Sequence, residues 1–253
     1  MLILSLAIAF SYFIVIYVNP PEYLPSNRND LRVIKFRFTR IIQLCLTLLI
    51  TIPYIVPGNY IENIRSLGLF PGFTHTHDLS LDLINIGRAV LLVVTLYCSS
   101  IYQYYLQDIT FIDENAQLLH HIRDYLFAPI TEEFIYRGII NLVVSDTRYT
   151  PCLFGIAHLH HAWHLYKQGH ALDQVVLSSI FQLIYTSIFG YIANLVYLIS
   201  GYNLLCVIVI HAGCNLFGIP QLTINGSKLQ KLIYYLLLVG GGVGVYIEIT
   251  WWV

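Results

Sequence analysis

The chain has 253 residues, of which 57% are hydrophobic and 11% are charged, and its formal net charge is −1. Average soluble domains carry roughly 25% charged residues, so this composition excludes disorder and ordinary solubility. A nearly neutral chain has no basic excess to hold a phosphate backbone, which argues against nucleic acid as a partner. Membrane lipid is the expected surrounding.

Eight mostly apolar stretches are candidate membrane-spanning helices, because a hydrocarbon core of about 30 Å takes about 20 helical residues. In chain order they are residues 1–18, 41–57, 85–106, 125–145, 149–166, 174–200, 202–219 and 229–250. The sequence therefore predicts an all-α fold, a polytopic membrane helical bundle with about eight transmembrane helices. No repeat or linker divides the chain, so residues 1–253 are expected to form a single integral membrane domain.

The positions of Lys and Arg predict the orientation, because cytoplasmic loops of membrane proteins collect these residues. With the N-terminus outside, nine of the thirteen cations belong to inside loops and three to outside loops. The inside set is Arg28, Arg32, Lys35, Arg37, Arg40, Arg123, Lys167, Lys228 and Lys231, and the outside set is Arg65, Arg88 and Arg148. The thirteenth cation, Arg137, remains inside a predicted span.

Two acids, Glu132 and Glu133, also remain well inside that apolar run, and the other twelve are predicted to lie in loops or near span ends. A charge at the bilayer centre costs at least ~2.5–3.5 kcal/mol, so three charges in one span require a reason. Glu133 and Arg137 are four residues apart and share a helix face, which predicts a structural ion pair. Glu132 points about 100° away from Glu133 and is predicted to be the free acid.

Five of the ten histidines fall inside later predicted spans. These five are His158, His160, His161, His164 and His211. The helical rise puts Glu132, His158 and His211 each about 12–13 Å from the inside end of its span. Asn215 lies one turn after His211, on the same face. Three helices are therefore expected to bring polar groups together at one depth.

A glutamate beside histidines suits hydrolysis by activated water. The carboxylate can take a proton from water, and an imidazole and an amide can donate hydrogen bonds to a developing oxyanion. A base, a water molecule and oxyanion donors together predict a peptide hydrolase. Cys214 lies near His211, but no Ser or Cys stands in a visible activated arrangement, so a thiol nucleophile is disfavoured.

Two alternatives remain open. His158, His161 and His164, with Glu132 or Glu133, offer nitrogen and oxygen ligands for zinc, although no HExxH motif is present. A membrane scaffold or transporter that uses buried Glu and His as a proton relay would also explain the buried charges.

Three motifs in order resemble a known family. Residues 128–137 (APITEEFIYR) resemble the EExxxR motif of the CaaX prenyl endopeptidases of the Ras-converting type, within the wider CaaX-protease and bacteriocin-processing family. Residues 154–161 (FGIAHLHH) resemble its FxxxH motif, with the additional histidines of the eukaryotic branch. Residues 211–215 (HAGCN) resemble its HxxxN motif. The similarity covers roughly residues 120–220.

The resemblance implies a glutamate-type intramembrane protease that needs no metal or other cofactor. It implies that Glu132 is the general base, that His158 positions the water, and that the oxyanion hole is formed by the two polar residues of the third motif. The implied catalytic set is thus Glu132, His158, His211 and Asn215, and the implied supporting set is Glu133, Arg137, Phe154 and His161.

The resemblance also implies the substrate and the location. The substrate would be a prenylated CaaX protein, such as a small GTPase, that carries a farnesyl or geranylgeranyl group and loses its last three residues. The eukaryotic family members reside in the endoplasmic reticulum membrane as multi-pass proteins. A site about 12 Å below the cytosolic face would suit a prenyl chain in lipid and a peptide tail at the interface.

Overall fold

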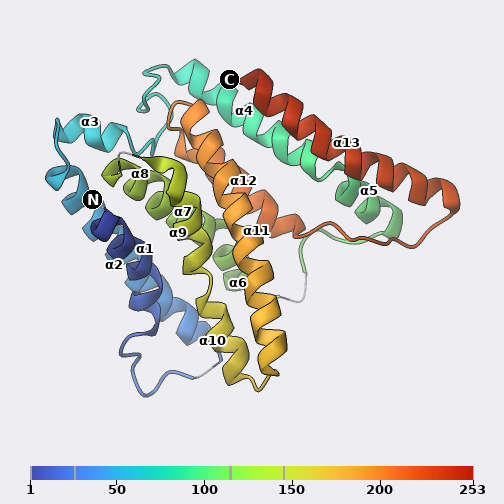
Figure 1. The fold of residues 1–253 in the computed structure, drawn as a ribbon, viewed down its shortest axis with the longest axis horizontal. Coiled ribbons are helices and arrows are strands. Elements are labelled where there is room, and N and C mark those ends of the chain that lie inside the picture. Colours follow the sequence, from blue (N-terminus) through green and yellow to red (C-terminus); the bar gives the residue numbers. More distant parts are fainter. Residues whose placement is uncertain (1, 26, 114–115, 145, 253) are drawn as a thin grey trace.

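The computed structural model describes residues 2–25, 27–113, 116–144 and 146–252. Within these ranges the regular structure is helical, apart from one isolated bridge between Phe70 and Phe73, and the predicted all-α class is confirmed (Figure 1). The α-helices are α1 (Leu2–Tyr17), α2 (Leu31–Ile55), α3 (Tyr60–Arg65), α4 (Leu79–Leu96), α5 (Cys98–Gln107), α6 (Leu118–Ile122), α7 (Ala128–Glu133), α8 (Ile140–Val143), α9 (Thr150–Ala157), α10 (His160–Lys167), α11 (Leu172–Ile199), α12 (Leu204–Phe217) and α13 (Lys228–Trp252). Two π-helical segments, η1 (Arg123–Phe127) and η2 (Phe134–Ile139), and a 3₁₀ turn, η3 (Thr147–Tyr149), complete the order.

Four of the described helices are long and apolar enough to cross a membrane: α2, α4, α11 and α13. The chain is therefore a membrane protein, while the count of about eight spans stays a prediction. Helices α1 and α12 are apolar but shorter, and the predicted span 125–145 is divided into α-helical and π-helical pieces. Helices α2 and α4 begin about ten and six residues before the apolar runs that predicted them, because polar N-cap residues, Asp30 and Asp78, set their starts.

The helices pack around one hydrophobic core. Helix α11 packs along α9, and α12 packs against α4, which in turn lies beside α13 (Figure 1). Segment η2 lies at the centre, where Ile135 and Ile139 are fully buried. Gly213 lets α12 approach α4 closely, because a Cβ at that position would lie 2.5 Å from a Val93 methyl carbon. This packing fixes the helices that carry the three motifs.

Asp82 corrects the predicted inventory of buried charges. The sequence placed it in a loop or at a span end, but it lies in the first turn of α4 and is fully buried. Its carboxylate accepts hydrogen bonds from the Gly72 N–H at 2.7 Å and from the hydroxyls of Thr74 and Thr76, each at 2.8 Å. A local turn supplies these donors, so the charge is satisfied without a cation.

The predicted continuous span 149–166 is wrong, since α9 ends at Ala157 and α10 begins at His160. The backbone N–H of His158 donates to the Gly155 carbonyl rather than to the Phe154 carbonyl four residues back. The Phe154 carbonyl therefore loses the backbone donor that a continuous α-helix would supply. The imidazole of His158 replaces that donor, with Nδ1 2.8 Å from the Phe154 oxygen. Hydropathy does not detect such a cap, because a window long enough to find a span averages over the break.

Pro129 accounts for an irregularity at η1. The Ala128 N–H bonds back to the Arg123 carbonyl, in the π-helical register. Pro129 has no N–H, so the carbonyl of Asp124 lacks a backbone donor from either residue 128 or residue 129. The side chain of Asn215 on α12 fills this place, with Nδ2 2.8 Å from the Asp124 oxygen. A proline in one helix therefore orients an amide on another.

We predict that Gly155→Ala destabilises the fold. A Cβ at this position would overlap the Ser187 hydroxyl of α11 and lie 3.1 Å from the Leu183 carbonyl oxygen. Overpacking of this kind costs about 1–3 kcal/mol. The matched control is Gly87→Ala in α4, where nothing lies within 4 Å. Thermal unfolding in detergent should show a lower midpoint for Gly155→Ala alone; equal midpoints would contradict close α9–α11 packing.

Candidate active site

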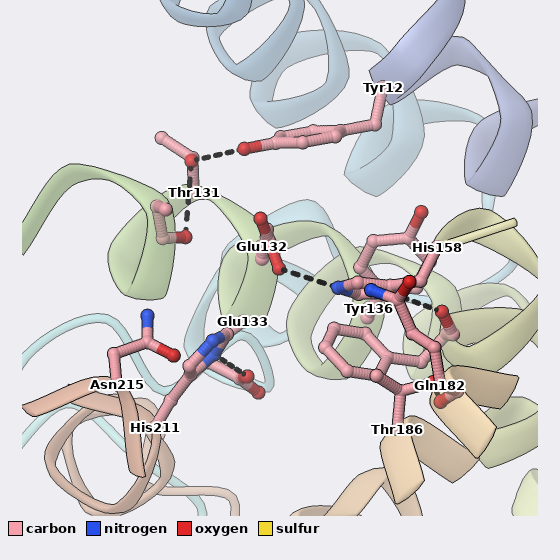
Figure 2. Close-up of polar contacts among 12 residues, drawn as sticks. Tyr12, Thr131, Glu132, Glu133, Tyr136, His158, Gln182, Thr186, His211 and Asn215 are labelled. Atoms are coloured by element: carbon pink, nitrogen blue, oxygen red, sulfur yellow. Dashed lines mark hydrogen bonds and ion pairs between the residues drawn. The ribbon is translucent and has the colours of Figure 1, made fainter. Parts of the chain in front are cut away.

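The two adjacent acids of α7 face different partners. Figure 2 shows Glu132 turned towards His158 and Glu133 turned towards His211. The side chain of Glu133 is 0% exposed and that of Glu132 is 16% exposed. The divergence predicted from helical geometry is present: one acid is fully enclosed, while the other reaches a cavity.

Glu133 binds two groups through one carboxylate. Arg137 Nη1 lies 3.0 Å from Oε1 and 2.9 Å from Oε2, which forms the predicted ion pair. His211 Nδ1 lies 2.6 Å from Oε1. A carboxylate accepts hydrogen bonds, so Nδ1 of His211 carries the proton and Nε2 is the ring nitrogen that remains for other partners.

His158 is oriented in the same way by a backbone carbonyl. Because the Phe154 oxygen only accepts hydrogen bonds, Nδ1 of His158 is protonated, and Nε2 lies 3.8 Å from Glu132 Oε2. That distance is longer than a direct hydrogen bond and is short enough for one water molecule to contact both groups. His158 is half-buried, with 18% of its side chain exposed.

Phe154 lies at the centre of the site. Its ring is 2% exposed and lies beneath the Arg137 guanidinium, whose Cζ is 4.4 Å from the ring centroid. The ring centroids of His158 and His211 lie 4.5 Å and 6.0 Å away. Phe154 therefore separates the two imidazoles and packs against both, which gives the aromatic position of the motif a physical role.

Two cavities meet at these residues. The larger, of about 480 Å³, is lined by Glu132, His158 and Asn215 together with residues of α1, α2 and η1. The second, of about 210 Å³, is lined by His158, His211 and Asn215 and by α11 residues that include Gln182 and Thr186. Thus His158 and Asn215 form the boundary between the two cavities, and all four predicted catalytic residues line one or both.

The described residues offer no set of ligands for the zinc-dependent alternative. In the ranges that the structure covers, no group of three His, Cys, Asp or Glu side chains is placed to hold a metal ion. The side chains of His160, His161 and His164 lie outside the described residues, and so does the predicted supporting role of His161. Cys214 lines the second cavity, but the ring of its neighbour His211 is held by Glu133.

Three features of the site were missed from the sequence. The Glu133–His211 contact joins residues 78 positions apart, a separation for which no periodicity gives a signal. Phe189 of α11 packs 5.0 Å from the His211 ring centroid and was lost among the apolar residues of its span. Pro129 was treated only as part of a motif, although a proline inside a predicted helix is itself a signal of irregular backbone.

Comparisons with known proteins agree with these motifs. A family model described as "Type II CAAX prenyl endopeptidase Rce1-like" matches residues 114–217. The "CAAX prenyl protease 2" of Saccharomyces cerevisiae is 27% identical over 251 residues, which cover 85% of this chain and 78% of the yeast protein. The human protein of that name is 27% identical over 132 residues, which cover 49% of this chain and 39% of the human protein. The Arabidopsis thaliana protein is 32% identical over 131 residues, 48% of this chain and 40% of its own length.

No solved structure matches this chain. The matched region contains the two acids of α7, the end of α9 and the polar face of α12, which are the elements that form the cavity boundary. The resemblance predicted from the three motifs is thereby confirmed: the chain is a peptidase whose residues 114–217 are similar to the Rce1-like CaaX prenyl endopeptidases.

Proposed function

We propose that this membrane peptidase removes the last three residues of prenylated CaaX proteins, small GTPases among them, by attack of a water molecule that Glu132 activates. The observation that carries the proposal is the placement of Glu132 and His158 side by side at the boundary of a cavity large enough for a short peptide. The proposal needs no metal, because a carboxylate and an imidazole supply the base and the water-positioning group.

The first step uses the fixed tautomer of His158. With Nδ1 committed to the Phe154 carbonyl, Nε2 of a neutral ring accepts one O–H of the water, and Glu132 accepts the other. The water oxygen then attacks the carbonyl carbon of the scissile bond while its proton passes to Glu132. The protonated Glu132 returns this proton to the leaving amine of the tripeptide.

The developing oxyanion needs donors on the opposite side. Asn215 uses one amide hydrogen on the Asp124 carbonyl, which leaves the second for the oxyanion. His211 can donate through Nε2 only when its ring is doubly protonated, since Nδ1–H already binds Glu133. The carboxylate of Glu133 fixes the orientation of the His211 ring through Nδ1, so Glu133 acts as a positioning residue as well as the partner of Arg137.

The residues that line the same cavity support the orientation that we propose. We place the chain in the endoplasmic reticulum membrane with the active site towards the cytosolic leaflet. The large cavity is lined by Arg28, Arg37 and Arg123, which are three of the nine cations assigned to inside loops. The loop segments 18–25 and 27–30 lie with α10 at one end of the molecule, and α3 lies at the other (Figure 1).

We predict that Glu132→Gln abolishes most tripeptide release from a farnesylated CaaX peptide. The amide has nearly the same shape but cannot accept the proton, and loss of a general base lowers turnover by about 10²–10⁴-fold. The measurement is tripeptide release by the full chain in membranes that lack other CaaX peptidases.

The matched control is Glu62→Gln, which removes an exposed carboxylate that pairs with Arg65 on α3. This variant should retain full activity, and the thermal unfolding midpoint of Glu132→Gln should remain that of the wild type. Wild-type turnover in a folded Glu132→Gln variant would rule out the glutamate base.

Pro129→Ala should lower kcat roughly tenfold with little change in KM, because misplacement of an oriented group reduces turnover more than binding. The alanine restores a backbone N–H at position 129, which competes with the Asn215 side chain for the Asp124 carbonyl oxygen. Pro53→Ala in α2 makes the same change in another helix interior, away from the cavities, and should leave kcat unchanged. Equal kcat values for Pro129→Ala and the wild type would contradict orientation of Asn215 by this carbonyl.

Exhaustive treatment with a zinc chelator should leave tripeptide release unchanged, because no step of the proposed reaction uses a metal ion. The assay compares treated and untreated membranes, with and without added zinc afterwards. Loss of activity that zinc restores would instead support the zinc-dependent alternative.

A further inference from the structure

Three arginines line the same cavity as Glu132 and His158. Arg28 comes from the loop before α2, Arg37 from the second turn of α2, and Arg123 from the start of η1. Arg28 is exposed, whereas Glu132 lies deeper, with 16% of its side chain exposed. Arg28 therefore marks the outer end of the cavity, while Arg37 and Arg123 are partly buried. The proposed reaction does not use them.

Among the described residues, two of these cations have no carboxylate partner. Arg123 is occupied, with its Nε 2.6 Å and its Nη2 2.9 Å from the Asp124 carboxylate and its Nη1 2.9 Å from the Asn29 side-chain oxygen. Arg37 lies over the Tyr17 ring, 5.2 Å from the centroid, within electrostatic range of Arg28 and Arg123. Across the described part of the chain, no ion pair involves Arg28 or Arg37.

Such a cluster repels itself unless an anion enters it. Like charges that converge on a cavity raise the local concentration of anions and bind them with charge-assisted hydrogen bonds. Arginine suits a carboxylate in particular, because its planar guanidinium can donate two parallel hydrogen bonds to the two oxygens. The cavity is therefore built to receive an anionic group at its outer end.

The distance to the base matches a three-residue tail. Arg123 precedes Glu132 by nine residues in one helical stretch, which is about 13 Å at 1.5 Å per residue and slightly less through π-helical turns. Three extended residues span about 10 Å. A peptide whose scissile bond lies at Glu132 therefore places its terminal carboxylate near the level of Arg123, in the cavity that Arg28 and Arg37 also line.

On the other side of His158 and Asn215, away from the arginines, the space continues into an apolar cavity. A third cavity, of about 180 Å³, lies among α4, α11, α12 and α13 and is lined by residues such as Leu92, Ile188 and Ile210. It shares Phe189 and Cys214 with the second cavity. An apolar chain is favoured on that side of His158 and Asn215, which leaves the arginine-lined side for the peptide tail.

We propose that Arg37, with Arg28 and Arg123, binds the C-terminal α-carboxylate of the substrate and thereby sets the length of the tripeptide that is removed. The inference rests on the proposed function, since it names the recognition element of the same site. Arg37 is the principal member, because it pairs with no carboxylate among the described residues and lies within electrostatic range of both other arginines.

The test uses two farnesylated CaaX peptides that differ only at the C-terminus, one a free acid and the other a carboxamide. The wild type should cleave the acid with a kcat/KM about 10–100-fold above that of the amide. Arg37→Gln should remove this preference by lowering kcat/KM for the acid and leaving that for the amide within about twofold. Arg37→Lys keeps the positive charge but loses the planar guanidinium with its paired donors. Its preference for the acid should lie between those of the wild type and Arg37→Gln.

Arg32→Gln is the matched control, because Arg32 lies on the same helix, is exposed and pairs with Asp30. It should retain the full preference for the acid. Equal cleavage of acid and amide by the wild type would overturn the inference, and so would an equal loss on both peptides in Arg37→Gln.

A binding measurement separates this inference from the proposed reaction. The folded Glu132→Gln variant should bind the acid peptide about 10–100-fold more tightly than the amide, and the double variant with Arg37→Gln should bind both equally. If the wild type cleaves neither peptide but this difference in binding is present, the carboxylate site stands and the proposed function fails. If the binding difference is absent, the carboxylate site fails.

Anionic lipid is the other source of such a group. The same kinetics are measured in bilayers of phosphatidylcholine with and without phosphatidylserine. A preference for the acid that persists in pure phosphatidylcholine supports the substrate carboxylate. An effect of Arg37→Gln that appears only with phosphatidylserine, and equally for both peptides, would assign the cluster to a lipid headgroup instead.

Discussion

The carboxylate of Glu133 is the contact on which the site depends, because it joins the helix of the two acids to α12. It lies 2.9 Å from Arg137 and 2.6 Å from His211, with no exposure to solvent. Removal of one partner from such a buried pair leaves an uncompensated charge, at a cost of about 3–5 kcal/mol. Since Glu133 is enclosed with these two partners, it is the neighbouring Glu132, turned by about 100°, that faces the cavity.

At two irregular points of the backbone, a side chain of the site donates to a carbonyl that has lost its helical donor. At the end of α9 the Phe154 carbonyl loses its helical donor and takes His158 Nδ1, and at η1 the Asp124 carbonyl takes Asn215 Nδ2. Within a membrane every backbone carbonyl must find a donor inside the protein. Here the donors are side chains that line the cavities, so the bond that satisfies the backbone also fixes the orientation of a functional group.

The sequence predicts the parts of this site that depend on spacing. The Glu133–Arg137 pair follows from four-residue spacing, and the divergence of Glu132 follows from the helical angle. Contacts between distant residues, such as that of Glu133 with His211, have no such signal. The break after Ala157 was missed because hydropathy averages over it, and the burial of Asp82 was missed because its donors come from a turn with no regular pattern. The arginines of α2 were predicted only as markers of orientation.

The polar side chains of the candidate site lie at the boundary between cavities of different polarity. The cavity on one side of His158 and Asn215 is lined by arginines and by residues near the start of α2, and the space on the other side continues towards an apolar cavity among α4, α11, α12 and α13. A substrate with an apolar chain on one side of the scissile bond and a charged end on the other has only one favourable direction across this boundary. In the proposed reaction, polarity can therefore select both the orientation of the substrate and the bond presented to Glu132, without specific contacts to each side chain of the tail.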